Sequence, residues 1–423
     1  MKLKHYDKFH EKLYTEKLAN GLTVFVVPKT GFSRKYAFFA TNYGGADRRF
    51  KVGGEWIDTP EGVAHFLEHK MFDTETGNAL VTLSANGASP NAYTSSEMTA
   101  YYFSCTDNFE ENLNTLLNFV SVPYFTDESV SKEQGIIGQE IRMTDDEPEY
   151  SLYFNLMKCL YEHHPLRYSV AGTIESIAQI TKNTLYDCHK IFYNPSNMVL
   201  CVIGDVDSDA VVKIANDVLP KIPGEIPDRD YGYEENPNSA SPLISVSMDI
   251  GLPMFAIGFK CGKVNNGAEF LKTQLTASLA LSILAGKSSK LYTDLYSAST
   301  ISENFSAEFE TVTDQSHVII SGESDNPQIV VEKLQDEIER INRSGIESTY
   351  FTRIKKSYHG KLIRSLNSFE NICAGMASSY FKNCSYFDRI SFLDEITKDD
   401  VEHFIRKNLT PEKIAVSIIT PIN

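Results

Sequence analysis

A repeated stretch of sequence constrains the fold of this chain more than any other feature. Residues 180–204 read ITKNTLYDCHKIFYNPSNMVLCVIG, and residues 396–420 read ITKDDVEHFIRKNLTPEKIAVSIIT. Both begin with Ile-Thr-Lys and continue through an amphipathic helical pattern, a proline (Pro195 and Pro411) and an apolar strand pattern. Self-similarity at a fixed offset is the signature of a duplicated structural unit. We therefore expect two related halves rather than three independent domains.

A second pair of segments agrees with this offset. Residues 101–120 and 318–338 each run from a strand pattern through a turn into an amphipathic helical pattern. In the first copy the apolar positions have the i, i+3, i+4, i+7 spacing of a one-sided helix, at Leu113, Leu116, Leu117 and Val120. The alternative is a chance resemblance between two unrelated segments. Two pairs in register favour duplication.

The boundaries of the halves follow from composition. Prolines, glycines and polar residues gather between Leu219 and Pro242, which is typical of a linker. We expect an N-terminal half over residues 1–218, a linker over 219–242 and a C-terminal half over 243–423. Hairpin-like strand patterns within the first half, at Leu22–Val27, Tyr36–Tyr43 and Thr99–Cys105, indicate an α+β fold with a mixed or largely antiparallel sheet backed by helices.

Charge and cysteine content exclude several classes of protein. The chain has 40 Lys and Arg against 56 Asp and Glu, a net charge of −16, so it is not a general nucleic-acid binder. The N-terminal residues MKLKHYDKFHEKL lack the apolar stretch of a secretory signal, and no apolar run is long enough for a membrane span. The 7 cysteines are widely spaced, with no C-x-x-C pair. We expect a cytoplasmic protein with reduced thiols and no membrane partner.

The sharpest chemical signal is the segment His65-Phe66-Leu67-Glu68-His69. On a helix these two histidines and the glutamate share one face, and Val63, Leu67 and Met71 form an apolar stripe on the opposite face. Two imidazoles one turn apart can chelate one divalent ion, and the carboxylate between them can reach a water molecule at the metal. Thr59 before Pro60 predicts where this helix begins.

A catalytic zinc needs a third protein ligand, which must come from elsewhere in the chain. The best candidates are Glu133 and Glu140, which are seven residues apart and therefore lie on nearly the same side of a helix. The stripe Val130, Ile137 and Ile141 turns that side toward the interior, where carboxylates are costly unless paired or bound to metal. Taken alone, the two glutamates fit an exposed acidic face better, since Glu is a common residue on exposed helix faces. The upstream metal motif favours the metal.

Three motifs in the same order resemble a known family. GVAHFLEHKMF, with its H-x-x-E-H, ANGASPNAYTSSEMTAYYFS and KEQGIIGQEIRM are similar to the inverzincin zinc peptidases of the pitrilysin, insulin-degrading enzyme and mitochondrial processing peptidase family. The sequence most resembles the short bacterial members of this family, which are found in the cytoplasm of Gram-positive bacteria. It implies two α+β halves, each a mainly antiparallel sheet covered by helices on one side. It also implies a zinc metalloendopeptidase.

The resemblance also assigns roles to residues. It implies that Zn²⁺ is held by His65, His69 and Glu140, that Glu68 is the general base, and that Glu133 is a supporting catalytic carboxylate beside the ligands. The family's substrate-binding strand segment matches Asn91, Ala92, Tyr93 and Thr94. An extended peptide would pair with an exposed strand edge there. The alternative is a turn around Pro90 and Asn91 that binds nothing.

The second half has no counterpart of the metal motif. With an offset of about 217 residues, as the repeat requires, the ligand positions fall on Ser282, Gly286 and Ser357. Family members usually have an Arg and a Tyr in their C-terminal half that bind substrate carbonyl groups, whereas the corresponding stretch here has Tyr292 and Tyr296 without an Arg. We therefore expect the chain to act on peptides as the zinc-bearing subunit of a dimer, with a homologous metal-free partner.

Two other functions fit parts of the pattern. Some relatives are catalytically silent structural subunits of a peptidase dimer, which predicts broken ligands. A zinc amidohydrolase on small amides would keep the metal site and have no peptide cleft. Because all four residues of the inner site are present, zinc-dependent hydrolysis of peptide bonds in extended peptides or unfolded segments is the favoured function.

Overall fold

Two mainly antiparallel β-sheets organise the chain, one in each of two compact units. The structure is a computed structural model and describes residues 1–422. The first unit comprises Met1–Ile141, Tyr168–Tyr231 and Ser365–Phe381. The second comprises Arg142–Arg167, Gly232–Arg364 and the described residues from Lys382 on. The α+β class expected from the sequence is confirmed.

The sheet of the first unit has seven strands. Their order is β1 (Lys2–Tyr6), β2 (Glu11–Lys17), β3 (Thr23–Pro28), β11 (Met198–Gly204), β4 (Lys35–Thr41), β10 (Thr99–Cys105) and β9 (Ser89–Thr94). Neighbouring strands are antiparallel except β3 and β11, which are parallel. The three expected strand patterns correspond to β3, β4 and β10. Because β9 ends this order, its outer side is an edge of the sheet.

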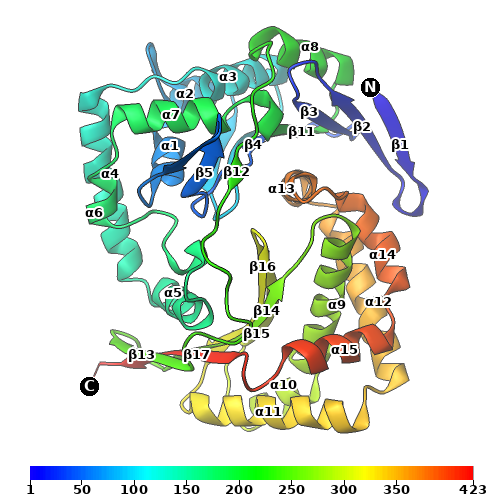
Figure 1. The fold of residues 1–423 in the computed structure, drawn as a ribbon. Coiled ribbons are helices and arrows are strands. Elements are labelled where there is room, and N and C mark those ends of the chain that lie inside the picture. Colours follow the sequence, from blue (N-terminus) through cyan, green and yellow to red (C-terminus); the bar gives the residue numbers. More distant parts are fainter. Residues whose placement is uncertain (423) are drawn as a thin grey trace. The chain divides into compact units, whose positions relative to one another are not determined.

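Helices cover one face of this sheet (Figure 1). They are α1 (Val63–Met71), α2 (Ala79–Ala85), α3 (Phe109–Ser121), α4 (Asp127–Asp145), α6 (Ile174–Ile177), α7 (Lys182–Phe192) and α8 (Ser208–Val218). The stripe predicted for α3 is confirmed, because Leu113, Leu116, Leu117 and Val120 are all fully buried. Alternate sheet residues, such as Phe39 and Phe103, complete this core.

One further helix lies on the other face of the same sheet. In α13 (Phe369–Phe381) the Cys373 thiol points to the Cys201 carbonyl oxygen of β11 at 3.8 Å. The Thr23 hydroxyl of β3 donates to the Tyr380 hydroxyl at 2.9 Å. Cys201 and Thr23 alternate along their strands with core residues that face the other helices, so α13 covers the opposite side.

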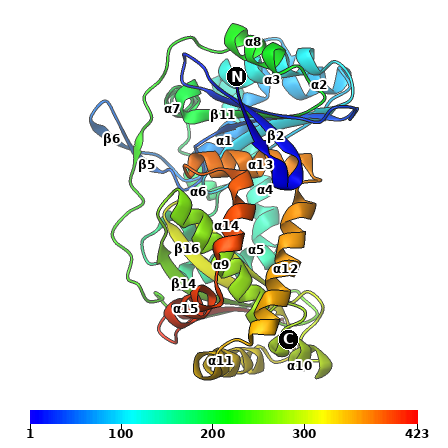
Figure 2. The ribbon, with the colours of Figure 1, turned by 90° about the vertical axis from the view of Figure 1, so that its right-hand side faces the viewer.

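Two smaller sheets complete the first unit. Strands β12 (Asp228–Arg229), β5 (Arg49–Val52) and β6 (Glu55–Asp58) form the first, and β7 (Asp73–Thr74) pairs with β8 (Gly77–Asn78) in the second. Figure 2 shows β5 and β6 projecting from this unit as a hairpin.

The second unit contains a five-stranded sheet. Its order is β13 (Leu243–Met248), β17 (Ile414–Pro421), β14 (Met254–Lys263), β16 (Gln315–Glu323) and β15 (Ser306–Val312), with only β13 and β17 parallel. The helices of this unit are α5 (Pro148–Leu160), α9 (Ala268–Leu284), α10 (Lys290–Ser297), α11 (Pro327–Ser344), α12 (Ser348–Ser365), α14 (Arg389–Glu395) and α15 (Lys398–Asn408). Gly258 allows α5 to approach the sheet, since a Cβ there would lie 3.0 Å from the Leu156 and Leu160 side chains.

The repeated sequence segments form equivalent elements. Thr181 caps α7 and Thr397 caps α15, each in a reciprocal capping box with the residue three positions later. The strand after α7, β11, is parallel to β3 and antiparallel to β4, and the strand after α15, β17, is parallel to β13 and antiparallel to β14. The repeated sequence segment therefore forms the same helix, with the same N-terminal cap, and the same following strand in both units.

The compact units differ from the expected boundaries at two places. Residues 142–167 were expected in the N-terminal half, yet they belong to the second unit, and residues 365–381 of the expected C-terminal half belong to the first. The reason is apolar packing: α5 buries Leu152, Leu156 and Leu160 against the second sheet, and α13 buries Cys373 against the first. The linker region divides between the units at Tyr231 and Gly232.

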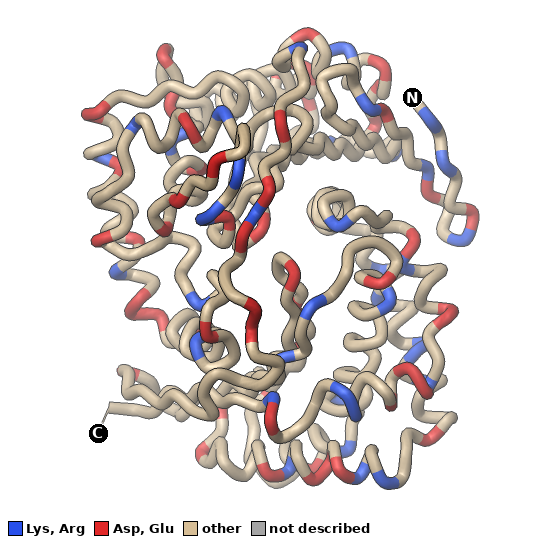
Figure 3. Tube along the Cα trace, viewed as in Figure 1, with Lys and Arg blue, Asp and Glu red and all other residues tan. Residues whose placement is uncertain are grey.

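Lys, Arg, Asp and Glu residues are distributed along the backbone of both units (Figure 3). No helix among residues 1–422 is long and apolar enough to cross a membrane.

Candidate metal centre

The helix that carries the histidines starts later than its sequence predicts. We expected a start at Thr59 and Pro60, but α1 begins at Val63. The residue before it, Gly62, has a φ of 92°, and a Cβ there would lie 2.6 Å from the Ala171 carbonyl oxygen. Only glycine fits this left-handed, closely approached position, so the helix begins after it. His65, Glu68 and His69 then share one face of α1, as expected.

Helix α4 brings a carboxylate to the two histidines. Glu140 Oε1 is 3.4 Å from His65 Nε2, and Glu140 Oε2 is 3.5 Å from His69 Nε2. One ligand atom from each residue lies within 4.8 Å of the others. Zinc with bonds near 2.0–2.1 Å holds tetrahedral donors about 3.3–3.4 Å apart. The donor set and its spacing therefore fit a zinc ion.

Glu133 lies beside this group and contacts His69 on the side of the ring that faces away from Glu140. Its Oε1 is 3.1 Å from His69 Nδ1, the ring nitrogen opposite the one that faces Glu140. The stripe expected to orient α4 is confirmed, since Val130, Ile137 and Ile141 are buried. A carboxylate at the outer nitrogen of a ligand imidazole fixes its tautomer and orientation.

The two groups that face each other have shifted pKa values. The hydrogen bond from His65 lowers the pKa of Glu140, and this effect outweighs burial, which raises it. Burial lowers the pKa of His69, but the hydrogen bond to Glu133 and the charges of Glu140 and Glu68 outweigh it and raise the pKa overall. The site is thus a concentration of negative charge around two imidazoles, which suits a divalent cation.

Glu68 is buried and held by one specific hydrogen bond. The Thr94 hydroxyl of β9 donates to Glu68 Oε2 at 2.7 Å. Thr94 Oγ1 also lies 3.2 Å from Thr99 Oγ1, which donates to the Tyr43 carbonyl oxygen at 2.9 Å. The Thr94 side chain, expected to bind substrate, therefore contacts the expected general base. No sequence signal joins these two residues, because they are 26 positions apart on different elements.

The other expected substrate-binding residues lie on the edge strand β9. Asn91, Ala92 and Tyr93 pair with β10 on its inner side. Pro90 and Asn91 are part of the strand, so the alternative of a turn there is wrong. Proline lacks an N–H donor and is tolerated in strands mainly at edges. The outer side of β9 pairs with no other strand among residues 1–422.

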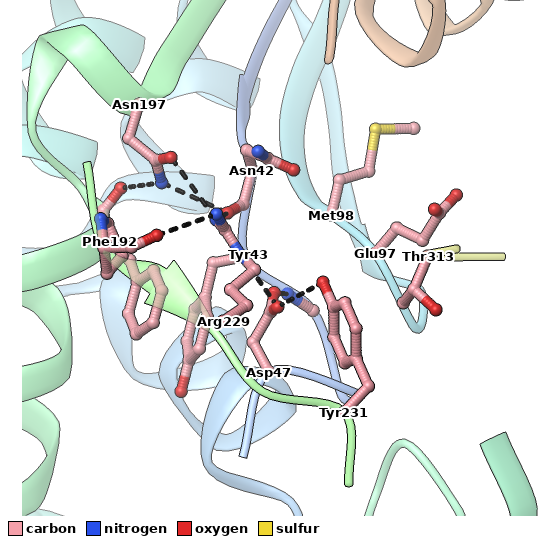
Figure 4. A network of polar contacts seen from close by, with 12 residues as sticks. Asn42, Tyr43, Asp47, Glu97, Met98, Phe192, Asn197, Arg229, Tyr231 and Thr313 are labelled. Carbon is pink, nitrogen blue, oxygen red and sulfur yellow. Dashed lines mark hydrogen bonds and ion pairs between the residues drawn. The ribbon is translucent and has the colours of Figure 1, made fainter. Parts of the chain in front are cut away.

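A buried network that sequence reasoning missed supports the end of β9 (Figure 4). The buried Asp47 carboxylate accepts hydrogen bonds from the Tyr231 hydroxyl at 3.1 Å and the Gly44 amide at 2.9 Å, and pairs with Arg229 at 2.8 Å. Amides of the same loop donate to the carbonyl oxygen atoms of the residues that follow β9. A lone Asp before Arg-Arg is an ordinary surface pattern, so no sequence signal revealed its burial.

The second unit does not repeat this centre. The group His65, His69 and Glu140 is the one metal-ligand cluster found within residues 1–422. Tyr292 and Tyr296 lie one turn apart on α10 with stacked rings whose centroids are 5.5 Å apart. Tyr292 is buried and Tyr296 is exposed.

Family models match both parts of the chain. The model of Insulinase (Peptidase family M16) matches residues 53–174, which include the two histidines and both glutamates of α4. The model of the Peptidase M16 inactive domain matches residues 179–358.

Individual relatives agree with these models. A relative from Bacillus subtilis named uncharacterized zinc protease YmfH is 38% identical over 98% of this chain and 98% of its own length. The mitochondrial-processing peptidase subunit beta of Caenorhabditis elegans is 32% identical over 46% of this chain and 42% of its own. A crystal structure of an M16-like peptidase from Alicyclobacillus acidocaldarius is 32% identical, covers 97% of this chain and 99% of its own, and superposes with a TM-score of 0.94. This chain therefore belongs to peptidase family M16, the insulinase family of zinc proteases.

Proposed function

We propose that this protein is a zinc-dependent endopeptidase that hydrolyses peptide bonds in extended peptides or unfolded segments. In this proposal His65, His69 and Glu140 are the zinc ligands. The main supporting observation is that the Glu140 carboxylate lies 3.4 Å from His65 Nε2 and 3.5 Å from His69 Nε2, next to the buried carboxylate of Glu68. The names of its relatives as zinc proteases support the choice of metal.

The chemistry divides between the metal and Glu68. A bound zinc ion would polarise the scissile carbonyl group and lower the pKa of water. Thr94 donates to Oε2 of Glu68, whereas Oε1 has no hydrogen-bond partner among the described residues. We assign Oε1 to take the proton from the attacking water and to pass it to the leaving amine. Glu133 orients His69 through Nδ1.

The substrate would bind as an added strand. Along Asn91, Ala92 and Tyr93, the outer side of β9 would offer an extended chain the backbone groups that point away from β10, and such pairing does not depend on side-chain identity. The Ala92 amide, which donates to Asn91 Oδ1 at 2.8 Å, would exchange this bond for one to the substrate. Thr94 at the end of this strand contacts Glu68, so a peptide on β9 would lie next to the general base. This geometry favours peptides over small amides.

We further propose that the active form is a cytoplasmic dimer with a homologous, metal-free partner. The support is the stretch around Tyr292 and Tyr296, which lacks the arginine that the family resemblance leads us to expect. Light scattering coupled to size-exclusion chromatography, together with a peptide assay on each fraction, tests this. Activity in a monomer fraction of the isolated chain would refute the proposal.

Metal analysis and a peptide-length series test the proposed activity. We expect one zinc per chain, loss of cleavage on chelation, and rates on internally quenched peptides that increase with length. Glu68→Gln should retain zinc and lower kcat by about 10²- to 10⁴-fold, the usual contribution of a general base. Zinc without peptide cleavage would indicate a silent structural subunit. Faster cleavage of a single amide than of any peptide would indicate an amidohydrolase.

A further inference from the structure

A fully buried lysine lies directly beside the candidate metal centre. Lys70 follows His69 on α1, and only 1% of its surface is exposed. Its Nζ donates to Asp73 Oδ2 and lies 3.9 Å from Glu133 Oε2. No part of the proposed reaction uses this residue.

Burial of this ammonium group calls for an explanation. A buried charge loses its hydration, which costs several kcal/mol per ion, and an apolar residue of similar size is often at least as stable. Asp73 does not account for the burial alone, because 39% of its side chain is exposed and it can be hydrated without Lys70. The side chain of Glu133 is only 14% exposed. Glu133 therefore depends on Lys70 more than Asp73 does.

The Glu133 carboxylate connects Lys70 to a metal ligand. One oxygen, Oε1, faces His69 Nδ1 at 3.1 Å, and the other, Oε2, faces Lys70. A carboxylate held at both oxygens cannot rotate away from the imidazole without losing one contact. Nδ1 of His65, in contrast, has no hydrogen-bond partner among the described residues. Orientation of the ligand pair by protein groups thus acts through His69.

We infer that Lys70 is a positioning residue of the metal centre: it holds the Glu133 carboxylate, which holds His69 with Nε2 toward the zinc position. This inference rests on the proposed zinc function. The residues that support a ligand imidazole typically change metal affinity 10- to 100-fold when they are removed.

The expected sign distinguishes this role from simple electrostatics. A cation near the site repels a divalent metal ion, so loss of the lysine charge alone would strengthen zinc binding. Loss of a positioning residue weakens it instead. Zinc affinity, measured by competition with a chromophoric chelator, is therefore a direct readout that needs no turnover.

The experiment is a double-mutant cycle on the full chain with Lys70→Met and Glu133→Ala. We expect Lys70→Met to weaken zinc binding at least tenfold in the wild-type background, and less than twofold in the Glu133→Ala background, because Lys70 acts through Glu133. The matched control is Lys260→Met. Lys260 is equally buried and pairs with Glu235 at 2.6 Å in the second unit, so its loss tests burial without a link to zinc. Its zinc affinity should stay within twofold of wild type.

Three results would overturn the inference: unchanged or tighter zinc binding in Lys70→Met, an equal loss in both backgrounds, or an equal loss in Lys260→Met. If Lys70→Met does not fold, Lys70→Gln keeps a donor for Asp73 without the charge and is expected to weaken zinc binding in the same way. Wild-type protein that binds no zinc would refute the proposed function itself, and is thus distinguishable from a failure of the Lys70 inference.

Discussion

The hydrogen bond from Thr94 to Glu68 leads to a quantitative prediction about catalysis. Thr94→Val keeps the branched shape that suits a strand and removes the hydroxyl that donates to Glu68 Oε2 at 2.7 Å. A hydrogen bond to a charged group contributes about 1.5–3 kcal/mol. This bond also fixes the orientation of Glu68. If the loss of that orientation raises the barrier by a similar amount, kcat falls about 10- to 150-fold, at about 1.4 kcal/mol per factor of ten.

The prediction separates kcat from KM. The Thr94 side chain points to Glu68 and Thr99, so KM should stay within about twofold, since no uniform substrate binding is removed. Zinc content should not change, because the hydrogen bonds of the Thr94 hydroxyl within residues 1–422 go to Glu68 and Thr99 and to none of the proposed zinc ligands. Thr94→Ser is the matched control, since it retains the hydroxyl and should recover most of the lost kcat.

Steady-state kinetics with one quenched peptide, on zinc-saturated protein, provides the measurement. A Thr94→Val enzyme with kcat within twofold of wild type would show that Glu68 does not need this donor. Equal defects in the Val and Ser variants would show that the strand, and not the hydroxyl, is responsible. A rise in KM with unchanged kcat would return Thr94 to the substrate-binding role expected from the sequence.

Two further predictions concern stability. Gly62→Ala should lower the free energy of unfolding by about 2 kcal/mol or more, because the new Cβ meets both a left-handed backbone and the Ala171 carbonyl oxygen. The control is Gly31→Ala, which should lower it by only about 1 kcal/mol, because Gly31 has a φ of 84° but no atom within 4 Å of the new Cβ. Equal losses in urea titrations would contradict the role of the close approach. Burial lowers the pKa of His189 to about 4, so its stabilising effect is complete above its ordinary pKa of about 6.5 and is lost as the pH falls toward 4. Between pH 7 and pH 5 the free energy of unfolding should therefore fall by about 2 kcal/mol more in wild type than in His189→Gln. Glutamine retains a donor for the Val120 carbonyl oxygen and does not titrate. The same fall in both proteins would contradict the prediction.

Local sequence patterns predicted much of the fold and the central residues of the candidate site. The period of α1 placed His65, Glu68 and His69 on one face, and the stripe of α4 turned Glu133 and Glu140 inward, because side-chain direction on a helix follows from sequence spacing alone. The predicted start of α1, at Thr59 and Pro60, was wrong because it rested on a local sequence signal. Proline and threonine are statistical start signals, whereas the close approach of Gly62 to another segment is a tertiary constraint.

The sequence alone determined which residue types are available for metal binding, on which elements they lie, and that the helix-to-strand unit around Thr181 recurs around Thr397. All of these depend on neighbours within one element. Other features could be known from the three-dimensional structure alone. Helix α5 packs on the sheet of the second unit, although it lies in the N-terminal part of the sequence, and α13 packs on the sheet of the first unit, although it lies in the C-terminal part. Thr94 donates a hydrogen bond to Glu68, and Lys70 lies near Glu133. These contacts join residues far apart in sequence, and they depend on which apolar faces pack together and which buried charges must be paired, properties that no local period records.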